Sequence, residues 1–144
     1  MRLQLTRRAD YAVRATLALA EAGRLLPSAE VARRMEIPPG FLPQILPDLV
    51  RHGILDRSLG RHGGYVLARE ASTLSLLEVI EAADGAAAPR TCVLRGGPCR
   101  GEEPCAVHPA VAEAHEAMRG VLSGATFASL LERRRPEGVR AVGE

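Results

Sequence analysis

Residues 28–67 decide the fold, and they read SAEVARRMEIPPGFLPQILPDLVRHGILDRSLGRHGGYVL. A short helix is expected over 28–35, because Ser28 is a residue type that caps helix N-termini. The Pro-Pro-Gly sequence at 38–40 predicts a tight turn. Over 41–50 the apolar residues recur on one helical face, which predicts a second, amphipathic helix. Two short helices joined by a tight turn are typical of a helix-turn-helix.

The second part of this stretch, residues 54–67, predicts two short strands around a glycine-rich tip. A β-hairpin that directly follows a helix-turn-helix is called a wing. Its glycines allow the backbone to approach another molecule closely, and Arg57, Arg61 and His62 place hydrogen-bond donors beside them. We therefore expect a mainly α fold, a winged helix-turn-helix with a small β-hairpin wing.

Further helices are expected on both sides of this stretch. Thr6 is placed to cap a helix over about 7–22, in which apolar residues recur at spacings of three and four. After the wing, helices are expected over about 75–83, 108–122 and 126–134.

The expected helix over 108–122 is long and carries an apolar seam. Its members step by four, three, four and three residues, and they are Val107, Val111, Ala114, Met118 and Val121. Such a heptad-like pattern is typical of a helix that pairs with a second copy. The alternative is a helix that packs on its own domain. We favour a long C-terminal dimerisation helix, and therefore a homodimer.

Composition and charge agree with a helical, nucleic-acid-facing protein. Hydrophobic residues make up 47% of the chain and aromatic residues only 3%, so aliphatic side chains must form the core. Residues 1–70 carry 11 arginines and seven acidic residues, a net charge of +4, whereas residues 71–144 carry a net charge of −2. A basic first half suggests that this part faces a polyanion.

The beginning of the chain is polar and basic, without the apolar segment of a secretory signal. No apolar run is long enough to cross a membrane. We therefore expect a cytoplasmic protein with no membrane partner. In the cytoplasm the reducing thiol pool disfavours stable disulfides, so clustered cysteines call for another explanation, and metal binding is the first candidate.

Three cysteines and a histidine follow the spacing Cys92-x6-Cys99-x5-Cys105-x2-His108. Thiolate sulfur is a soft ligand that suits iron–sulfur clusters and zinc. The wide gaps fit a cluster better than the closely paired knuckles of structural zinc sites, although zinc stays open. His108 would add a nitrogen ligand whose binding depends on pH. No phosphate loop, oxyanion loop or carboxylate pair indicates catalysis, so we expect a protein that is not an enzyme.

Several residues of the winged helix-turn-helix are candidates for contact with DNA. In such folds the second helix reads base edges in the major groove, while the first helix and the wing hold phosphates. Gln44 can face a base edge, Arg51 is placed for a phosphate, and Arg61 at the wing tip can enter a minor groove. The complete candidate set is Ser28, Phe41, Gln44, Arg51, Arg57, Arg61 and His62.

Taken together, these features resemble the Rrf-two family of bacterial regulators over essentially the whole chain. The resemblance rests on the helix-turn-helix and on four sequence motifs, which are Met1-Arg2-Leu3, Tyr11-Ala12, the wing Gly60-Arg61-His62-Gly63-Gly64-Tyr65 and the loop with Cys92, Cys99 and Cys105. It implies a homodimer that binds a partly palindromic double-stranded DNA operator. It also implies that the state of an iron–sulfur cluster changes the affinity for DNA, and so transcription.

The resemblance leaves two candidates for the fourth cluster ligand. The IscR type of the family has a histidine just after the third cysteine, matched here by His108, and holds a 2Fe–2S cluster. The NsrR type holds a 4Fe–4S cluster with an aspartate near the start of the partner subunit, and Asp10 falls at about that position. We favour His108 and a 2Fe–2S cluster, with Asp10 and a 4Fe–4S cluster as the alternative.

Some residues depart from the family pattern. Pro43 stands where the IscR type has a base-reading glutamate, and Leu59 stands where many relatives have a wing arginine. Pro43 and Pro47 each remove a helix hydrogen bond, and Pro47 is predicted to kink the second helix. An operator sequence therefore cannot be transferred from a relative.

These observations predict four parts of the chain. They are a winged helix-turn-helix DNA-binding domain over 1–85, a cysteine-rich cluster-binding loop over 86–106, the dimerisation and terminal helices over 107–135, and a flexible tail over 136–144.

These features are compatible with three functions. The favoured one is a transcriptional regulator whose cluster senses redox state, nitric oxide or iron–sulfur status. The alternative is a DNA-binding regulator with zinc or a thiol switch in place of the cluster. An iron–sulfur protein for electron transfer or cluster delivery is the third, and the basic wing argues against it.

Overall fold

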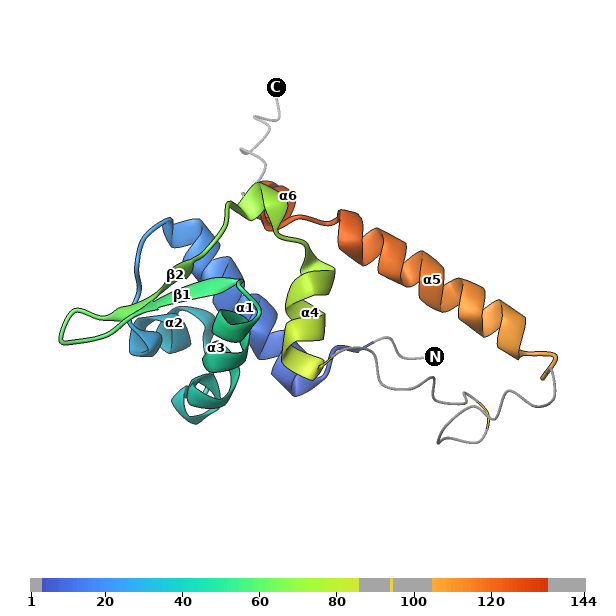
Figure 1. Cartoon of the computed structure of the whole chain (residues 1–144), viewed down its shortest axis with the longest axis horizontal. Coiled ribbons are helices and arrows are strands. Elements are labelled where there is room, and N and C mark those ends of the chain that lie inside the picture. The colour runs from blue at the N-terminus through green and yellow to red at the C-terminus, as the bar shows by residue number, and fades with distance from the viewer. Residues whose placement is uncertain (1–3, 86–93, 95–104, 135–144) are drawn as a thin grey trace, which may run out of the picture.

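The computed structural model of the protein describes residues 4–85, 94 and 105–134. Figure 1 shows these residues as a group of short helices with one β-hairpin on one side and a long helix on the other. The elements in chain order are α1 (Arg7–Ala22), α2 (Ser28–Met35), the 3-10 helix η1 (Pro39–Phe41), α3 (Leu42–Arg51), β1 (Leu55–Ser58), β2 (Gly64–Leu67), the 3-10 helix η2 (Ala71–Thr73), α4 (Leu76–Asp84), α5 (His108–Gly124) and α6 (Phe127–Arg134). The predicted mainly α fold with a small hairpin is confirmed.

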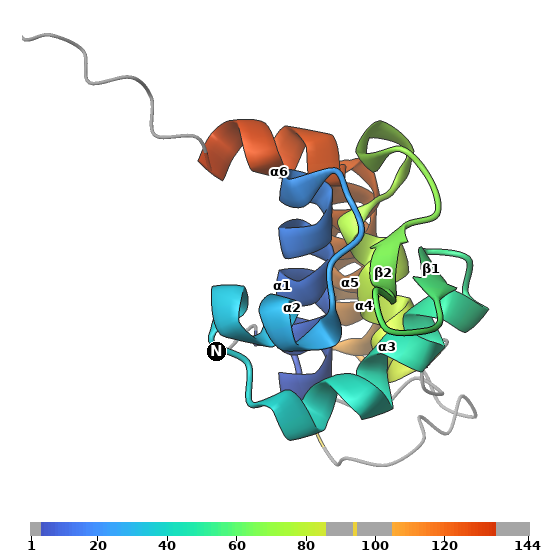
Figure 2. The same ribbon diagram turned by 90° about the vertical axis from the view of Figure 1, so that its left-hand side faces the viewer.

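Helix α1 lies at the centre of the core. It contacts α2, α3, α4, α6 and strand β2, and Figure 2 shows it running between these elements. Its buried face consists of alanines together with Thr16 and Leu19. Small side chains allow the neighbouring helices to approach closely, and leucine, isoleucine and valine from those helices complete the core. The aliphatic core expected from the composition is confirmed, with Phe127 as its one fully buried aromatic side chain among the described residues.

The caps of the first two helices differ from each other. Thr6 caps α1 as predicted, since its hydroxyl accepts a hydrogen bond from the N–H of Ala9 at 3.0 Å. The predicted capping role of Ser28 is wrong, because α2 begins at Ser28 itself and the N-cap position belongs to Pro27, which has no capping side chain. At the other end of α2, Glu36 adopts the left-handed conformation with φ 53°.

Helix α3 continues through Pro47. Its buried side consists of Leu42, Ile45, Leu46 and Leu49, whereas both of its prolines lie on the exposed side. Pro43 stands in the first turn, where the missing N–H has no helical partner in any case. An interior proline costs about 3 kcal/mol, but burial of one large aliphatic side chain contributes about 1.5–3 kcal/mol. Four such side chains therefore outweigh the effect of Pro47.

The wing is held against the start of α2. Strands β1 and β2 are antiparallel, with Leu55 opposite Leu67 and Ser58 opposite Gly64. Leu26 extends this pairing, because it exchanges two backbone hydrogen bonds of 2.9 Å and 2.8 Å with Tyr65. The hairpin and the helix-turn-helix therefore form one connected unit.

Beyond the packing of α4 and α6 on α1, two backbone hydrogen bonds link α4 to the end of the described chain. The N–H of Leu76 donates to the carbonyl of Ala125 at 2.8 Å, and the N–H of Phe127 donates to the carbonyl of Leu74 at 2.9 Å. These bonds join the start of α4 to the link between α5 and α6. From this junction α5 extends away from the core, as Figure 1 shows, and none of its residues is buried.

The three helices predicted after the wing are confirmed, with ends that agree within two residues. Most of the predicted cysteine-rich loop and the predicted flexible tail lie outside the described residues. Among the helices that the structure describes, none combines the length and the apolar character needed to cross a bilayer.

Candidate DNA-binding surface and metal centre

The exposed side of α3 carries the residues predicted to read DNA. Gln44 and Arg51 are both exposed, and they lie on the side opposite the buried leucines and isoleucine. The backbone carbonyl of Gln44 accepts a hydrogen bond from Arg8 at 2.9 Å, and this contact does not use the side-chain amide. The buried side of α3 therefore packs on the core, while its exposed side presents polar groups.

Arg51 is engaged within its own helix. Its guanidinium forms an ion pair with Asp48, although 73% of the Arg51 side chain is exposed. A phosphate that binds Arg51 would therefore have to compete with the Asp48 carboxylate. Sequence reasoning did not select Asp48, although an acidic residue three positions before an arginine on a helix indicates such a pair.

Phe41 lies at the junction of η1 and α3 and is half-buried. Its ring packs on Tyr11, with 5.0 Å between ring centroids, and the guanidinium carbon of Arg14 lies 5.0 Å from the centroid of the Tyr11 ring. Phe41 therefore joins the turn of the helix-turn-helix to α1. Its contact with DNA stays a prediction.

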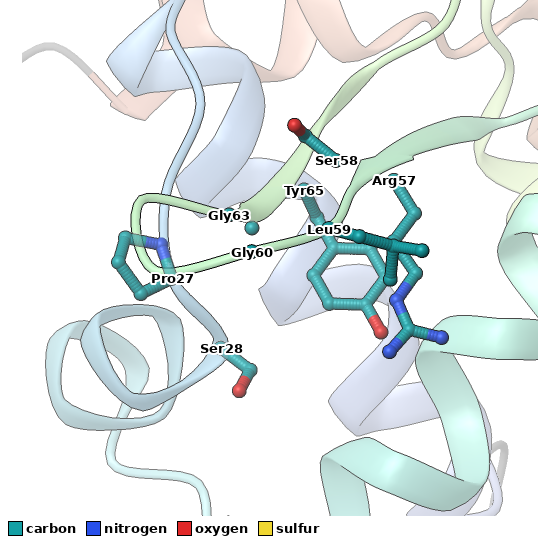
Figure 3. A pocket seen from close by; sticks show the side chains of 9 residues that line it. Pro27, Ser28, Arg57, Ser58, Leu59, Gly60, Gly63 and Tyr65 are labelled. Atoms are coloured by element: carbon teal, nitrogen blue, oxygen red, sulfur yellow. The ribbon is translucent and has the colours of Figure 1, made fainter.

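A shallow hollow of about 230 Å³ is lined by residues of the wing and of the start of α2. Figure 3 shows Ser28 on one side of it and Arg57 on the other, with the Tyr65 hydroxyl and the Arg57 guanidinium pointing the same way. The guanidinium carbon of Arg57 lies 6.0 Å from the centroid of the Tyr65 ring. The structure thus brings two candidate DNA contacts, Ser28 and Arg57, to the same hollow.

The tip of the wing is exposed throughout. Arg61 and His62 are exposed there, as predicted, close in sequence to Leu59, which is 77% exposed. The wing tip therefore offers cationic and apolar groups together, and no described part of the protein covers them.

Two of the four candidate cluster ligands are described, and they are neighbours. Cys105 is a half-buried free thiol directly before α5, and His108 is the first residue of that helix. The N–H of His108 donates to the carbonyl of Cys105 at 3.0 Å, so the two residues share one turn. Cys92 and Cys99 lie outside the described residues. Within the described residues no group of three or more histidine, cysteine and acidic side chains is close enough to hold a metal ion.

Asp10, the alternative fourth ligand, is paired with Arg14. The Nε of Arg14 donates to one Asp10 oxygen at 3.1 Å, and a terminal nitrogen contacts the other oxygen. Arg14 also donates to the carbonyl of Met35 at 3.1 Å, across to α2. The hydrogen bonds that Arg14 donates to Asp10 raise the pKa of Arg14 above its ordinary value. A metal that used Asp10 would have to displace this guanidinium.

Comparisons with known proteins give a consistent result. The family described as "Rrf2: Iron-dependent Transcriptional regulator" matches residues 5–133. The HTH-type transcriptional regulator IscR of Escherichia coli O1:K1 / APEC is 32% identical over 132 residues, which cover 90% of this chain and 80% of IscR.

Two solved structures are similar in fold. CymR, the global cysteine regulator of B. subtilis, has a TM-score of 0.78 at 19% identity and covers 92% of this chain and 98% of its own. The structure named T. potens IscR has a TM-score of 0.75 at 23% identity and covers 98% of this chain and 94% of its own.

The match to the family and the similarity to IscR each extend over most of the chain. The expectation that the protein is not an enzyme is confirmed, because these relatives are transcriptional regulators. The chain belongs to the Rrf2 family of DNA-binding transcriptional regulators, the family that its wing and cysteine motifs predicted.

Proposed function

We propose that this protein binds a double-stranded DNA operator as a homodimer, and that a 2Fe–2S cluster held by Cys92, Cys99, Cys105 and His108 controls that binding. The observation that carries the proposal is the connected winged helix-turn-helix. This unit lies in the basic half of the chain, and it exposes Gln44 on α3 and Arg61 on the wing. Such a regulator would act in the cytoplasm. Residues 1–85 would bind DNA, 86–106 would hold the cluster, 107–135 would form the dimer, and 136–144 would be a flexible tail.

The donor set suits an iron–sulfur cluster. Cys105 supplies a half-buried thiol, and His108 supplies a nitrogen within one turn of it at the entry of α5. Asp10 is less suited to be the fourth ligand, because its carboxylate is held by Arg14. A bound cluster would supply a centre that responds to oxidants, nitric oxide or iron supply. Its four ligands would tie the cysteine segment to α5.

The homodimer is supported by the surface of α5. On one side α5 contacts α4, to which the half-buried Arg119 is joined by an ion pair with Glu81. Two members of the predicted seam lie on the open side, where Met118 is 37% exposed and Val121 is 73% exposed. A second copy of α5 would remove these apolar side chains from water.

The cluster can be tested with protein purified without oxygen. We expect bound iron and sulfide in equal amounts and the absorption spectrum of a 2Fe–2S centre. His108→Ala should change that spectrum, whereas Asp10→Ala should leave it unchanged, because Asp10 is paired with Arg14. A spectrum that changes only in Asp10→Ala would instead support a 4Fe–4S centre. Protein without iron and sulfide after anaerobic reconstitution would contradict the cluster altogether.

A second candidate is a regulator that uses zinc or a thiol switch. It is favoured by the fold similarity to CymR, a cysteine regulator, and by the free thiol of Cys105. Metal analysis separates the candidates, since a zinc site holds zinc without sulfide and a thiol switch holds neither. The third hypothesis, electron transfer or cluster delivery, predicts no salt-sensitive binding to a specific DNA sequence.

A further inference from the structure

Arg8 connects three helices through its guanidinium group. Its Nε donates to the carbonyl oxygen of Ala83 at 2.6 Å, in the last turn of α4. One terminal nitrogen donates to the carbonyl oxygen of Gln44 at 2.9 Å and also contacts the carboxylate of Asp48, both on α3. Arg8 itself stands in the first turn of α1, and Figure 1 shows the start of α1 beside the end of α4. Helix α3 contacts both helices.

Asp48 is the acidic centre of this arrangement. One of its oxygens contacts Arg8 and the other contacts Arg51, and its side chain is only 16% exposed. Nearby, the Thr6 hydroxyl donates to Asp84 at 2.6 Å, which adds a second link between α1 and α4. The carboxylate of Asp48 therefore joins a helix-bridging arginine to an arginine on the DNA-facing side.

These contacts differ from an ordinary surface ion pair. Isolated surface pairs contribute little because two flexible side chains must be ordered in water. Arg8 instead uses a rigid planar group to bind two backbone carbonyls and one carboxylate at once. Two of its acceptors are backbone atoms, so the contact fixes helix positions rather than only side chains.

We propose that Arg8 and Asp48 are positioning residues for operator recognition. Arg8 fixes the position of α3 relative to α4 by binding the backbone of Gln44, the residue predicted to read a base edge. Asp48 orients the side chain of Arg51. Base readout requires side chains to be held within about 0.5 Å of the productive geometry, whereas non-specific phosphate contact does not. The inference rests on the proposed DNA binding and adds residues that do not themselves touch a base.

The central variant is Arg8→Lys, which keeps the charge but cannot reach all three acceptors with one ammonium group. Arg69→Lys is the matched control, because Arg69 is similarly exposed and pairs with Glu78 through a single bond of 2.8 Å. The probes are a duplex selected by the wild-type protein from a random pool and a scrambled duplex of equal length, both at one salt concentration.

For Arg8→Lys we expect the affinity for the selected duplex to fall about tenfold, which is the size of one lost base contact. The affinity for the scrambled duplex, and the salt dependence of that affinity, should stay within about twofold of the wild-type values. Asp48→Asn should lower the selectivity as well, but raise the affinity for the scrambled duplex, because Arg51 loses its competing carboxylate. A loss of global stability alone would lower both affinities together. Unchanged selectivity in Arg8→Lys, or an equal loss in Arg69→Lys, would overturn the proposal.

Amide hydrogen exchange separates this inference from the proposed function. In Arg8→Lys, exchange should rise in α3 and in the last turn of α4 but not in α2, and Arg69→Lys should show no such pattern. An unchanged exchange in α3 would overturn the positioning role, whatever the DNA results. A wild-type protein that selects no sequence from the pool would instead contradict the proposed function.

Discussion

At the scale of single residues, the wing depends on one glycine. Gly64 begins β2, where its backbone lies directly against the chain at Leu26 and Pro27. A Cβ at this position would come closer to the Leu26 carbonyl than real Cβ atoms do, and the neighbours are backbone atoms that cannot turn aside. The close approach is needed because Leu26 and Tyr65 exchange two hydrogen bonds beside it.

We therefore predict that Gly64→Ala destabilises the protein by about 1–3 kcal/mol, as overpacking does elsewhere. It should also weaken operator binding, because the wing can no longer stay attached to the helix-turn-helix. Chemical unfolding and DNA titration measure the two effects. The control is Gly40→Ala, where an added Cβ meets nothing within 4 Å and should change stability by less than about 0.5 kcal/mol. Equal effects of the two variants would contradict the prediction.

At the scale of elements, α4 shows how a helix start is stabilised. The Ser75 hydroxyl accepts from the N–H of Glu78 at 3.2 Å, and the Glu78 carboxylate accepts from the N–H of Ser75 at 2.9 Å. Burial alone would raise the pKa of Glu78, but hydrogen bonds from Ser75 and the contact with Arg69 outweigh it and lower the pKa below its ordinary value of 4.5.

This lowered pKa predicts a pH dependence of stability. A carboxyl with a lower pKa in the folded state stabilises the protein above its unfolded pKa and loses that contribution as the pH falls. Glu78→Gln keeps a capping side chain but cannot ionise. We expect it to be less stable than wild type near neutral pH, and the difference to shrink as the pH falls through the unfolded pKa of about 4.3 and then through the lower folded pKa. A constant difference between pH 7 and pH 3 in thermal unfolding would contradict this.

Helix α3 shows the opposite balance between local preference and packing. Local propensity disfavours a helix with prolines at 43 and 47, yet the helix forms because its buried side contributes more than Pro47 costs. The arrangement has a consequence for recognition. The prolines occupy exposed positions on the side that carries Gln44, so fewer polar groups remain there to read bases.

At the scale of the whole molecule, α5 is attached at one end. The junction of Leu76 with Ala125 and the ion pair between Arg119 and Glu81 hold it, but none of its residues is buried. A helix of 17 residues gains most of its stability from packing. In the proposed homodimer, the α5 of the partner subunit would supply further packing.

We predict that Val121→Glu dissociates the dimer, because a carboxylate in an apolar seam would lose its hydration. Light scattering or sedimentation should give a mass near the 15.4 kDa of one chain for this variant and near twice that for wild type. Ser123→Glu adds the same charge two residues away, outside the predicted seam, and should leave the dimer intact. A monomeric wild-type protein would contradict the seam, and so would dissociation by Ser123→Glu.

The helices, the hairpin and the family could be predicted from the sequence alone. Apolar spacing, the Pro-Pro-Gly turn at 38–40 and the glycine-rich wing are local signals, and each is contained in a short stretch of chain. The pairing of Asp10 with Arg14 is local as well, since the residues are four apart on one helix, although sequence reasoning treated Asp10 only as a metal ligand.

Only the tertiary structure decided which distant residues meet. Arg8 and Asp48 are 40 positions apart, and Leu26 and Tyr65 join the wing to α2 from separate segments. Their contacts depend on how α1 packs against α3, α4 and β2. Helix packing is set by the sum of many weak apolar contacts, so no spacing along the chain encodes a single polar contact across it. The sequence alone therefore determined the elements and the family, and the packing decided how α3, the helix predicted to face DNA, is held.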